Sequence, residues 1–206
     1  MKDLPHLGET NEIYRRLEER AIAENNDLNH RVAQCRKCRR GHFLPTVGSG
    51  HPLADILLLK FQPHYLEVTE GVAFYGRSGT AVLKSMERLG VDPLLVYGTN
   101  LIKCHDVDQT EGCRNCPVYW LEEFHITQPR IVVIMGQQTL EVVNRERIAG
   151  MRDVAWEPGT LQDLTSFCQA LVTPDIDGAL DEERAKSDFW RAFRNLGDWF
   201  QDQPPY

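Results

Sequence analysis

The chain has 206 residues, of which 42% are hydrophobic and 26% are charged, and its formal net charge is −7. This composition is typical of a globular protein, and the negative charge gives no overall attraction to nucleic acid, so such binding would need a local basic patch. No apolar run reaches membrane-spanning length and residues 1–10 contain no apolar signal region, so we expect a cytoplasmic protein without a membrane segment. The length suits one domain over residues 1–206, with residues 1–34 as an N-terminal helical extension.

The N-terminal half of the chain alternates helical and extended patterns. Apolar residues at helical spacing predict a helix over residues 10–34, and a continuous apolar run predicts a buried strand over residues 55–59. The loop over residues 60–77 is long for a compact domain, and such loops are commonly functional. Ser78 is expected to cap the next helix, which ends at Gly90.

The C-terminal half repeats this alternation, apart from an irregular stretch over residues 149–165. Strands are expected over residues 94–97, 130–136 and 167–172, and helices over residues 117–127, 137–144 and 181–201. Strands that alternate with helices imply a parallel sheet covered on both faces. The sequence therefore predicts an α/β fold, namely a three-layer α/β/α sandwich with a central parallel sheet of about four strands.

The cysteines are interpreted as metal ligands rather than disulfides, given the expected compartment. Cys35 and Cys38 lie among basic residues, and nearby cations favour the thiolate form that binds metal. Cys113 and Cys116 form a second pair, which with the first would give the four-thiolate set that zinc prefers, although the gap between pairs exceeds that of zinc ribbons. The basic residues from Arg36 to Arg40 also suit a phosphate backbone, which makes DNA a candidate partner.

Asn100 closely follows the strand expected over residues 94–97. In open α/β sheets a ligand crevice forms at the carboxyl ends of the strands. A carboxamide both donates and accepts hydrogen bonds, which suits reading the edge of a base. Cys104 lies four residues further along the chain. We therefore expect this segment to link a ligand crevice to a metal site.

Six short motifs occur in a specific order and spacing, although no single one is decisive. They are CRKC at residues 35–38, VGSG with ADILLL at residues 47–50 and 54–59, GVAFYGRSG at 71–79, GTNLIKC at 98–104, CPVYWL at 116–121 and QPRIVVIMG at 128–136. Together they resemble the uracil-DNA glycosylases that carry an iron–sulfur cluster, which are family 4 of that superfamily. The resemblance runs from about Cys35 to Asp175 and covers most of the chain.

This resemblance implies a cluster and a base pocket. Phe74 would stack on a flipped-out base and Asn100 would read its edge, since a base outside the helical stack needs an aromatic surface and hydrogen bonds. In the alternative, Phe74 packs in the core and Asn100 caps a turn. Cys113 is the alternative fourth ligand of the cluster, and zinc is the alternative metal. The ligands that the resemblance implies for a [4Fe–4S] cluster are Cys35, Cys38, Cys104 and Cys116.

Two catalytic positions depart from the family pattern. The Gly-Glu-Ala-Pro-Gly loop of the family aligns with residues 60–64, where Phe61 replaces the carboxylate, and Thr173 replaces the histidine of a His-Pro-Ser motif. An oxocarbenium-like transition state loses stabilisation when the negative charge beside it is removed. Gln62 or His64 could compensate, because an amide can hold a water and histidine can act near neutral pH.

Three functions are compatible with these residues. The first is an active glycosylase of base-excision repair type, a hydrolase that removes uracil or a damaged base with the help of Gln62 or His64. The second is a non-catalytic homologue that binds DNA, a nucleotide or a protein, and the third is a redox-sensing iron–sulfur protein. The altered motifs and the net acidity favour weak or lost glycosylase activity, so whether the chain is an enzyme stays open at this point.

Overall fold

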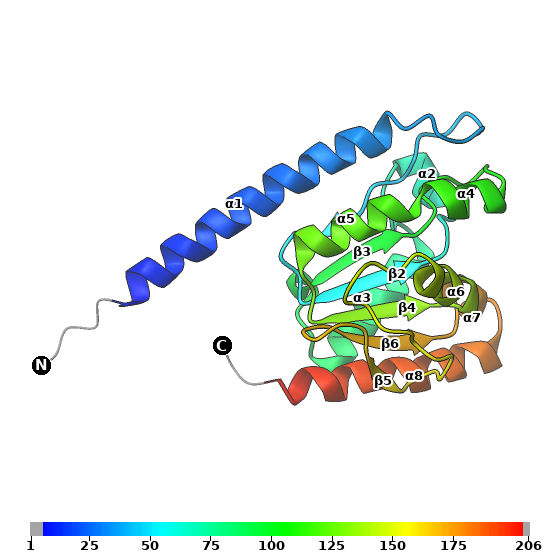
Figure 1. Cartoon of the computed structure of the whole chain (residues 1–206). Coiled ribbons are helices and arrows are strands. Elements are labelled where there is room, and N and C mark those ends of the chain that lie inside the picture. The colour runs from blue at the N-terminus through cyan, green and yellow to red at the C-terminus, as the bar shows by residue number, and fades with distance from the viewer. Residues whose placement is uncertain (1–5, 204–206) are drawn as a thin grey trace, which may run out of the picture.

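The computed structural model describes residues 6–203, which form a six-stranded mixed sheet with helices on both faces (Figure 1). The strands are β1 (Ser49–Gly50), β2 (Ile56–Lys60), β3 (Val96–Asn100), β4 (Ile131–Met135), β5 (Leu161–Asp163) and β6 (Gln169–Thr173). Their order is β1-β3-β2-β4-β6-β5, in which the four central strands are parallel and each outer strand is antiparallel to its neighbour. The predicted α/β/α sandwich with four parallel strands is confirmed, with two short strands added at its edges.

Helices α5 and α6 cover one face of the sheet, and α3, α7 and α8 cover the other. The long helix α1 packs along α5 and projects beyond the rest of the chain (Figure 1). No helix among residues 6–203 is both long and apolar enough to cross a membrane. The helices are α1 (His6–Ala33), α2 (Tyr65–Glu70), α3 (Arg77–Leu89), α4 (Gln109–Asn115), α5 (Pro117–Thr127), α6 (Gln137–Arg145), α7 (Ile176–Ala179) and α8 (Glu183–Gln201).

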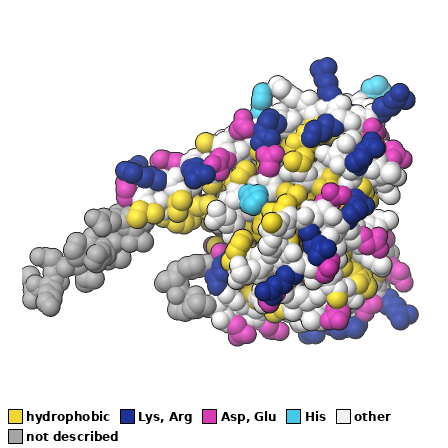
Figure 2. Space-filling view, viewed as in Figure 1, with side chains coloured by type: hydrophobic (Ala, Val, Ile, Leu, Met, Phe, Trp, Pro, Cys, Tyr) yellow, Lys and Arg dark blue, Asp and Glu magenta, His cyan; other side chains and the backbone are white. Residues whose placement is uncertain are grey.

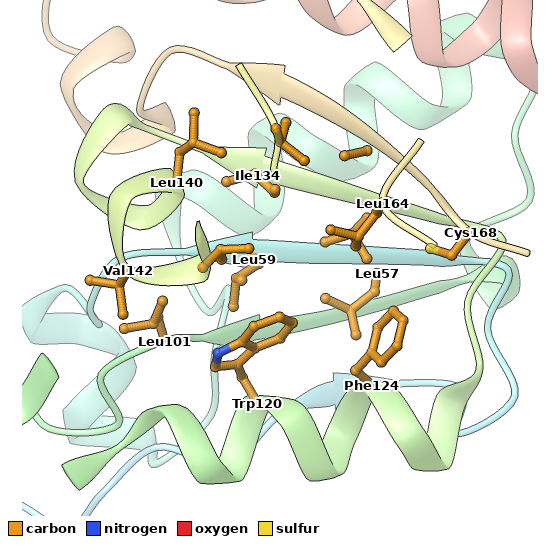
Figure 3. Close-up of a cluster of buried hydrophobic side chains, with 14 of the residues drawn as sticks. Leu57, Leu59, Leu101, Trp120, Phe124, Ile134, Leu140, Val142, Leu164 and Cys168 are labelled. Atoms are coloured by element: carbon orange, nitrogen blue, oxygen red, sulfur yellow. The ribbon is translucent and has the colours of Figure 1, made fainter. Parts of the chain in front are cut away.

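The continuous apolar run of β2 is explained by burial on both faces. Leu57 and Leu59 belong to the same buried cluster as Trp120 and Phe124 of α5 (Figure 3), whereas the alternate side chains of the strand face α3 and α8. Fully burying a side chain of this size contributes about 1.5–3 kcal/mol to the free energy of folding. The core therefore lies in two layers, one on each side of the sheet.

The register aligns the carboxyl ends of the central strands at one edge of the sheet. Lys60 pairs with both Asn100 and Met135, and Met135 pairs with Thr173. All four residues are buried, although three of them are polar or charged. Buried polar groups need partners, so this edge is where the polar chemistry of the molecule is concentrated.

Several element boundaries differ from the prediction. Pro93–Leu95 forms a 3₁₀-helix behind the capping side chain of Asp92, so the strand expected over residues 94–97 begins at Val96 instead. The loop expected over residues 60–77 contains α2, and the irregular stretch contains β5. Ser78 is the second residue of α3 and is buried rather than serving as its cap.

Candidate functional site

A crevice with a volume of about 430 Å³ opens at the carboxyl edge of the parallel strands. We call it the edge crevice. Gln62 and His64, from the loop between β2 and α2, line it together with Asp175 and Asp177 from the region of α7. Gln62 also accepts a 3.4 Å hydrogen bond from the Gln109 side chain. The structure thus brings both sequence-predicted water-handling residues to one solvent-accessible recess.

Neither Asn100 nor Phe74 lines the edge crevice. Asn100 is fully buried; its Nδ2 donates a 3.1 Å hydrogen bond to Thr46 Oγ1, while its Oδ1 has no partner among the described residues. Phe74 is half-buried with a φ of 59°, which is rare for a residue other than glycine. Its ring lies against Gly98, where an added Cβ would be 2.6 Å from Phe74 Cδ2.

Lys60 occupies the space beside the Phe74 ring. Its Nζ lies 5.6 Å from the ring centroid, within the range of a cation–π contact. The same Nζ donates hydrogen bonds to Glu67 Oε2 at 2.5 Å and to Asp177 Oδ2 at 2.7 Å. The side chains of Lys60 and Glu67 are 0% exposed, and that of Asp177 is 30% exposed. We call this group the lysine cage.

Glu67 organises the loops around the cage. Besides Lys60, it accepts hydrogen bonds from the backbone N–H of His64 at 2.6 Å and from the backbone N–H of Phe74. It therefore holds a lining residue of the edge crevice and the aromatic residue in fixed positions. The sequence analysis missed both Glu67 and Asp177. The available signal was Lys60 itself, a charged residue at the end of the otherwise apolar strand ILLLK.

Phe61 and Thr173 occupy the two positions at which the chain departs from the resembled family. Phe61 packs partly buried against the hydrophobic core, and Thr173 is fully buried with its hydroxyl donating to the Pro174 carbonyl at 3.0 Å. Asp175 caps α7 by accepting from the Gly178 N–H at 2.8 Å, and burial raises the pKa of its carboxyl above 3.8. Neither Phe61 nor Thr173 therefore supplies the carboxylate or the imidazole that the resembled family has at these positions.

Four cysteines surround a small enclosed cavity, which we call the cysteine cavity. The Cys104 thiol has its pKa raised to about 12, first by burial and then by the neighbouring Cys116. Cys113 does not line this cavity and lies beside Arg145. No group of three or more His, Cys, Asp or Glu placed to hold a single metal ion is found in residues 6–203. The cysteines that line the cavity are Cys35, Cys38, Cys104 and Cys116.

Polar side chains contact two of these sulfurs. Asn115 Nδ2 lies 3.3 Å from Cys38 Sγ, and the Tyr119 hydroxyl is hydrogen-bonded to Cys35. Lys103 lines the same cavity and is itself buried, with its Nζ 2.7 Å from Glu123 Oε2. Because Lys103 lies three residues after the end of β3, the segment from Asn100 to Cys104 connects the lysine cage region to the cysteine cavity.

The basic segment from Arg36 to Arg40 lies next to the cysteine cavity. Arg36, Lys37 and Arg39 are exposed, while Arg40 is half-buried and donates to the Phe43 carbonyl at 2.5 Å. The Lys37 ammonium lies 4.9 Å from the centroid of the Tyr119 ring. The segment therefore presents a local cluster of cations on a chain whose net charge is negative.

The comparisons with known proteins all point to one superfamily. A family model described as the uracil DNA glycosylase superfamily matches residues 47–196. The curated relatives include proteins named type-4 uracil-DNA glycosylase from Sulfurisphaera tokodaii, 27% identical over 123 residues, and from Archaeoglobus fulgidus, 26% identical over 120 residues. These alignments cover 56% and 54% of this chain and 56% and 59% of the relatives, so the chain spans little more than half the length of each.

The matched residues include all four parallel strands, the edge crevice and the lysine cage. Cys104 and Cys116 fall within them, whereas Cys35 and Cys38 precede them. The α/β architecture, a mixed sheet with helices on both faces, agrees with the match. The chain therefore belongs to the uracil DNA glycosylase superfamily.

Proposed function

We propose that the chain is a uracil-DNA glycosylase-like iron–sulfur protein of base-excision repair type in which glycosylase activity is weak or lost. The family membership and the names of the relatives support a DNA-directed role. The observation that carries the proposed loss of activity is the lysine cage, because the Lys60 ammonium lies beside the Phe74 ring. A base that stacks on Phe74 would compete with this ammonium.

The cage opposes base binding, and the residue at position 61 opposes the chemistry. Displacing the Lys60 ammonium would leave Glu67 buried without its counter-ion, and breaking such a pair costs about 3–5 kcal/mol. Glycosidic cleavage develops positive charge on the sugar. The two carboxylates of the cage are both paired with Lys60, and Phe61 supplies no carboxylate that could stabilise that charge. The unpaired Oδ1 of Asn100 is the feature that most favours retained base recognition.

An oligonucleotide assay tests the proposed loss of activity. A duplex containing one uracil is incubated with the purified protein and then treated with alkali, which breaks the strand at an abasic site. We expect scission close to that of a no-protein control and of a uracil-free duplex. Robust scission that Asn100→Ala abolishes would overturn the proposal. Introducing Phe61→Glu together with Thr173→His is expected to raise any residual activity.

We further propose that the cysteine cavity holds a [4Fe–4S] cluster through the four cysteines that line it. The four cysteines that the resemblance implies as ligands come from three separate segments of the chain and line one cavity. This convergence supports the proposed cluster. When bound, the cluster would cross-link the segment after α1 to the segment after β3 and to the start of α5.

Absorbance and metal analysis test this assignment. Protein purified without oxygen is expected to be brown, with iron and sulfide in equal amounts. Cys116→Ser should lose most of the iron, whereas the matched variant Cys113→Ser should keep it, because Cys113 lies outside the cavity. Colourless protein that contains stoichiometric zinc would contradict the cluster, and equal loss in both variants would contradict the ligand set.

A second candidate function is DNA binding without catalysis, which the exposed basic segment favours. Each lysine or arginine that contacts a phosphate adds about one unit to the slope of log binding constant against log salt concentration. Arg36→Ala with Arg39→Ala should therefore weaken binding to any duplex and lower the magnitude of this slope by about two. The control is Arg184→Ala with Arg194→Ala, which removes the same charge from exposed positions of α8. Equal effects of the two pairs would reject the segment as the contact.

A further inference from the structure

Three separate segments of the chain supply the cysteines that line the cysteine cavity. One segment follows α1, one follows β3 and one leads into α5, and α5 contacts both α1 and β3 (Figure 1). In chain order these cysteines are Cys35, Cys38, Cys104 and Cys116. Because the segments are distant in sequence, their meeting depends on side-chain contacts that connect α1, β3 and α5.

Glu123 of α5 is the centre of a buried network that makes such contacts. Its carboxylate accepts hydrogen bonds from Lys103 Nζ at 2.7 Å and from Thr99 Oγ1 at 2.9 Å, and Lys103 Nζ also donates to Thr99 Oγ1 at 2.5 Å. Charged side chains of both signs are scattered over the surface in Figure 2, whereas those of Lys103 and Glu123 are only 2% and 1% exposed. The network therefore joins α5 to β3 and to the residue before Cys104 inside the molecule.

The Tyr97 hydroxyl extends this network to α1. It lies 3.2 Å from Glu123 Oε1 and 3.1 Å from Asn25 Oδ1, so it can donate its proton to either oxygen. Burial, followed by the charge of Glu123, raises the pKa of Tyr97 well above its ordinary value, so the hydroxyl keeps this proton. Asn25 lies on α1, ten residues before Cys35. The network thus reaches all three elements next to the cysteines.

We propose that Glu123, Lys103 and Tyr97 are positioning residues that hold the three cysteine segments around one cavity. A buried ion pair adds little net stability compared with apolar side chains of the same volume, so the network is better explained by the single arrangement that it specifies. Residues behind a metal site orient its ligands in the same way. This role rests on the proposed cluster, although the connection between the three segments can also be measured without metal.

The rate of iron release tests the positioning in full-length protein purified without oxygen. Bipyridyl, a chelator of ferrous iron, is added and the coloured complex is followed over time. Tyr97→Phe keeps the ring and removes only the hydroxyl, and Glu123→Gln removes the central charge; each should speed iron release by about tenfold or more. The matched control is Val133→Ala, because Val133 packs in the core layer on the other face of the sheet. The control should release iron at the rate of the unaltered protein.

The reduction potential separates positioning from a general loss of stability. Lys103 lines the cysteine cavity, and Glu123 balances its charge. Glu123→Gln leaves this cation unbalanced, and a cation beside a cluster favours the more negatively charged reduced form. Glu123→Gln should therefore shift the potential upward in spectroelectrochemistry, whereas Val133→Ala should leave it unchanged even where its Tm is lower.

Disulfide trapping tests the same positioning if the purified protein holds no iron, a result that would reject the cluster alone. In a Cys38→Ser, Cys113→Ser background, diamide is expected to link Cys35 to one of the two remaining cavity cysteines. Tyr97→Phe should slow this link by about tenfold or more through lost proximity, while circular dichroism shows that the chain is folded. Iron release as slow in Tyr97→Phe as in Val133→Ala, or an unchanged rate of disulfide formation in iron-free protein, would overturn the proposal.

Discussion

Replacing Lys60 by methionine isolates the energetic role of the lysine cage. The substitution keeps an unbranched side chain of similar length and removes the ammonium, so Glu67 keeps two backbone N–H partners but loses its buried counter-ion. Breaking one partner of a buried pair costs about 3–5 kcal/mol. For a chain of this size about 1 kcal/mol corresponds to about 2–4 °C in Tm. Lys60→Met is therefore expected to lower Tm by about 6–20 °C.

Thermal unfolding of four variants, prepared with equal metal content, measures this effect. The double variant Lys60→Met with Glu67→Gln should recover most of the loss, because no fully buried charge is left unpaired and Asp177, which also loses Lys60, is 30% exposed. Asp177→Asn should cost less than Lys60→Met, because its side chain is 30% exposed and Lys60 keeps Glu67. The matched control Lys186→Met breaks an exposed pair with Glu183 and should change stability by less than about 1 kcal/mol. Equal Tm changes for Lys60→Met and Lys186→Met would refute the reasoning.

Three further outcomes are expected. Gly98→Ala should cost about 1–3 kcal/mol by forcing the Phe74 ring away, measured as a lower Tm. Burial raises the pKa of Asp175 in the folded chain, so its charge opposes folding at neutral pH, and this cost is relieved as the pH falls toward 3.8. Asp175→Asn should therefore raise Tm at pH 7, with a gain that shrinks on acidification. Asn115→Ala removes a hydrogen bond to Cys38, so the proposed cluster should show a lower reduction potential by spectroelectrochemistry.

The parallel strands could be predicted because burial on both faces leaves a continuous apolar run, as in β2 and β4. The strand β3 was placed too early, because the apolar residues Leu94 and Leu95 belong to a 3₁₀-helix whose cap is set by Asp92. The short helices α2, α4 and α7 were missed, since so few residues carry too little periodicity. Tertiary contacts, rather than local pattern, determine such elements.

The sequence likewise predicted some residues of the candidate site and missed others. The pairs of cysteines separated by two residues can be recognised in the sequence, and Asn100 follows a recognisable strand. The lysine cage cannot be recognised there, because Glu67 and Asp177 lie 7 and 117 residues from Lys60 and meet it only when the sheet edge forms. No periodicity links a lysine at a strand end to an aspartate in a short helix. Ion pairs of this kind depend on topology, which local patterns do not specify.

The cage also predicts how substitutions would affect the proposed base site at Phe74. A small residue at position 60 would clear the face of Phe74, but it would leave Glu67 charged, buried and bonded to the backbone that holds Phe74 in place. Neutralising Glu67 alone would leave the Lys60 ammonium beside the ring. Clearing the ring without leaving a buried charge therefore needs both changes together, so the proposed base site is blocked by a pair of residues that stabilise each other. Absent base binding in a folded Lys60→Gly, Glu67→Gln double variant would show that the ion pair is not what blocks the site.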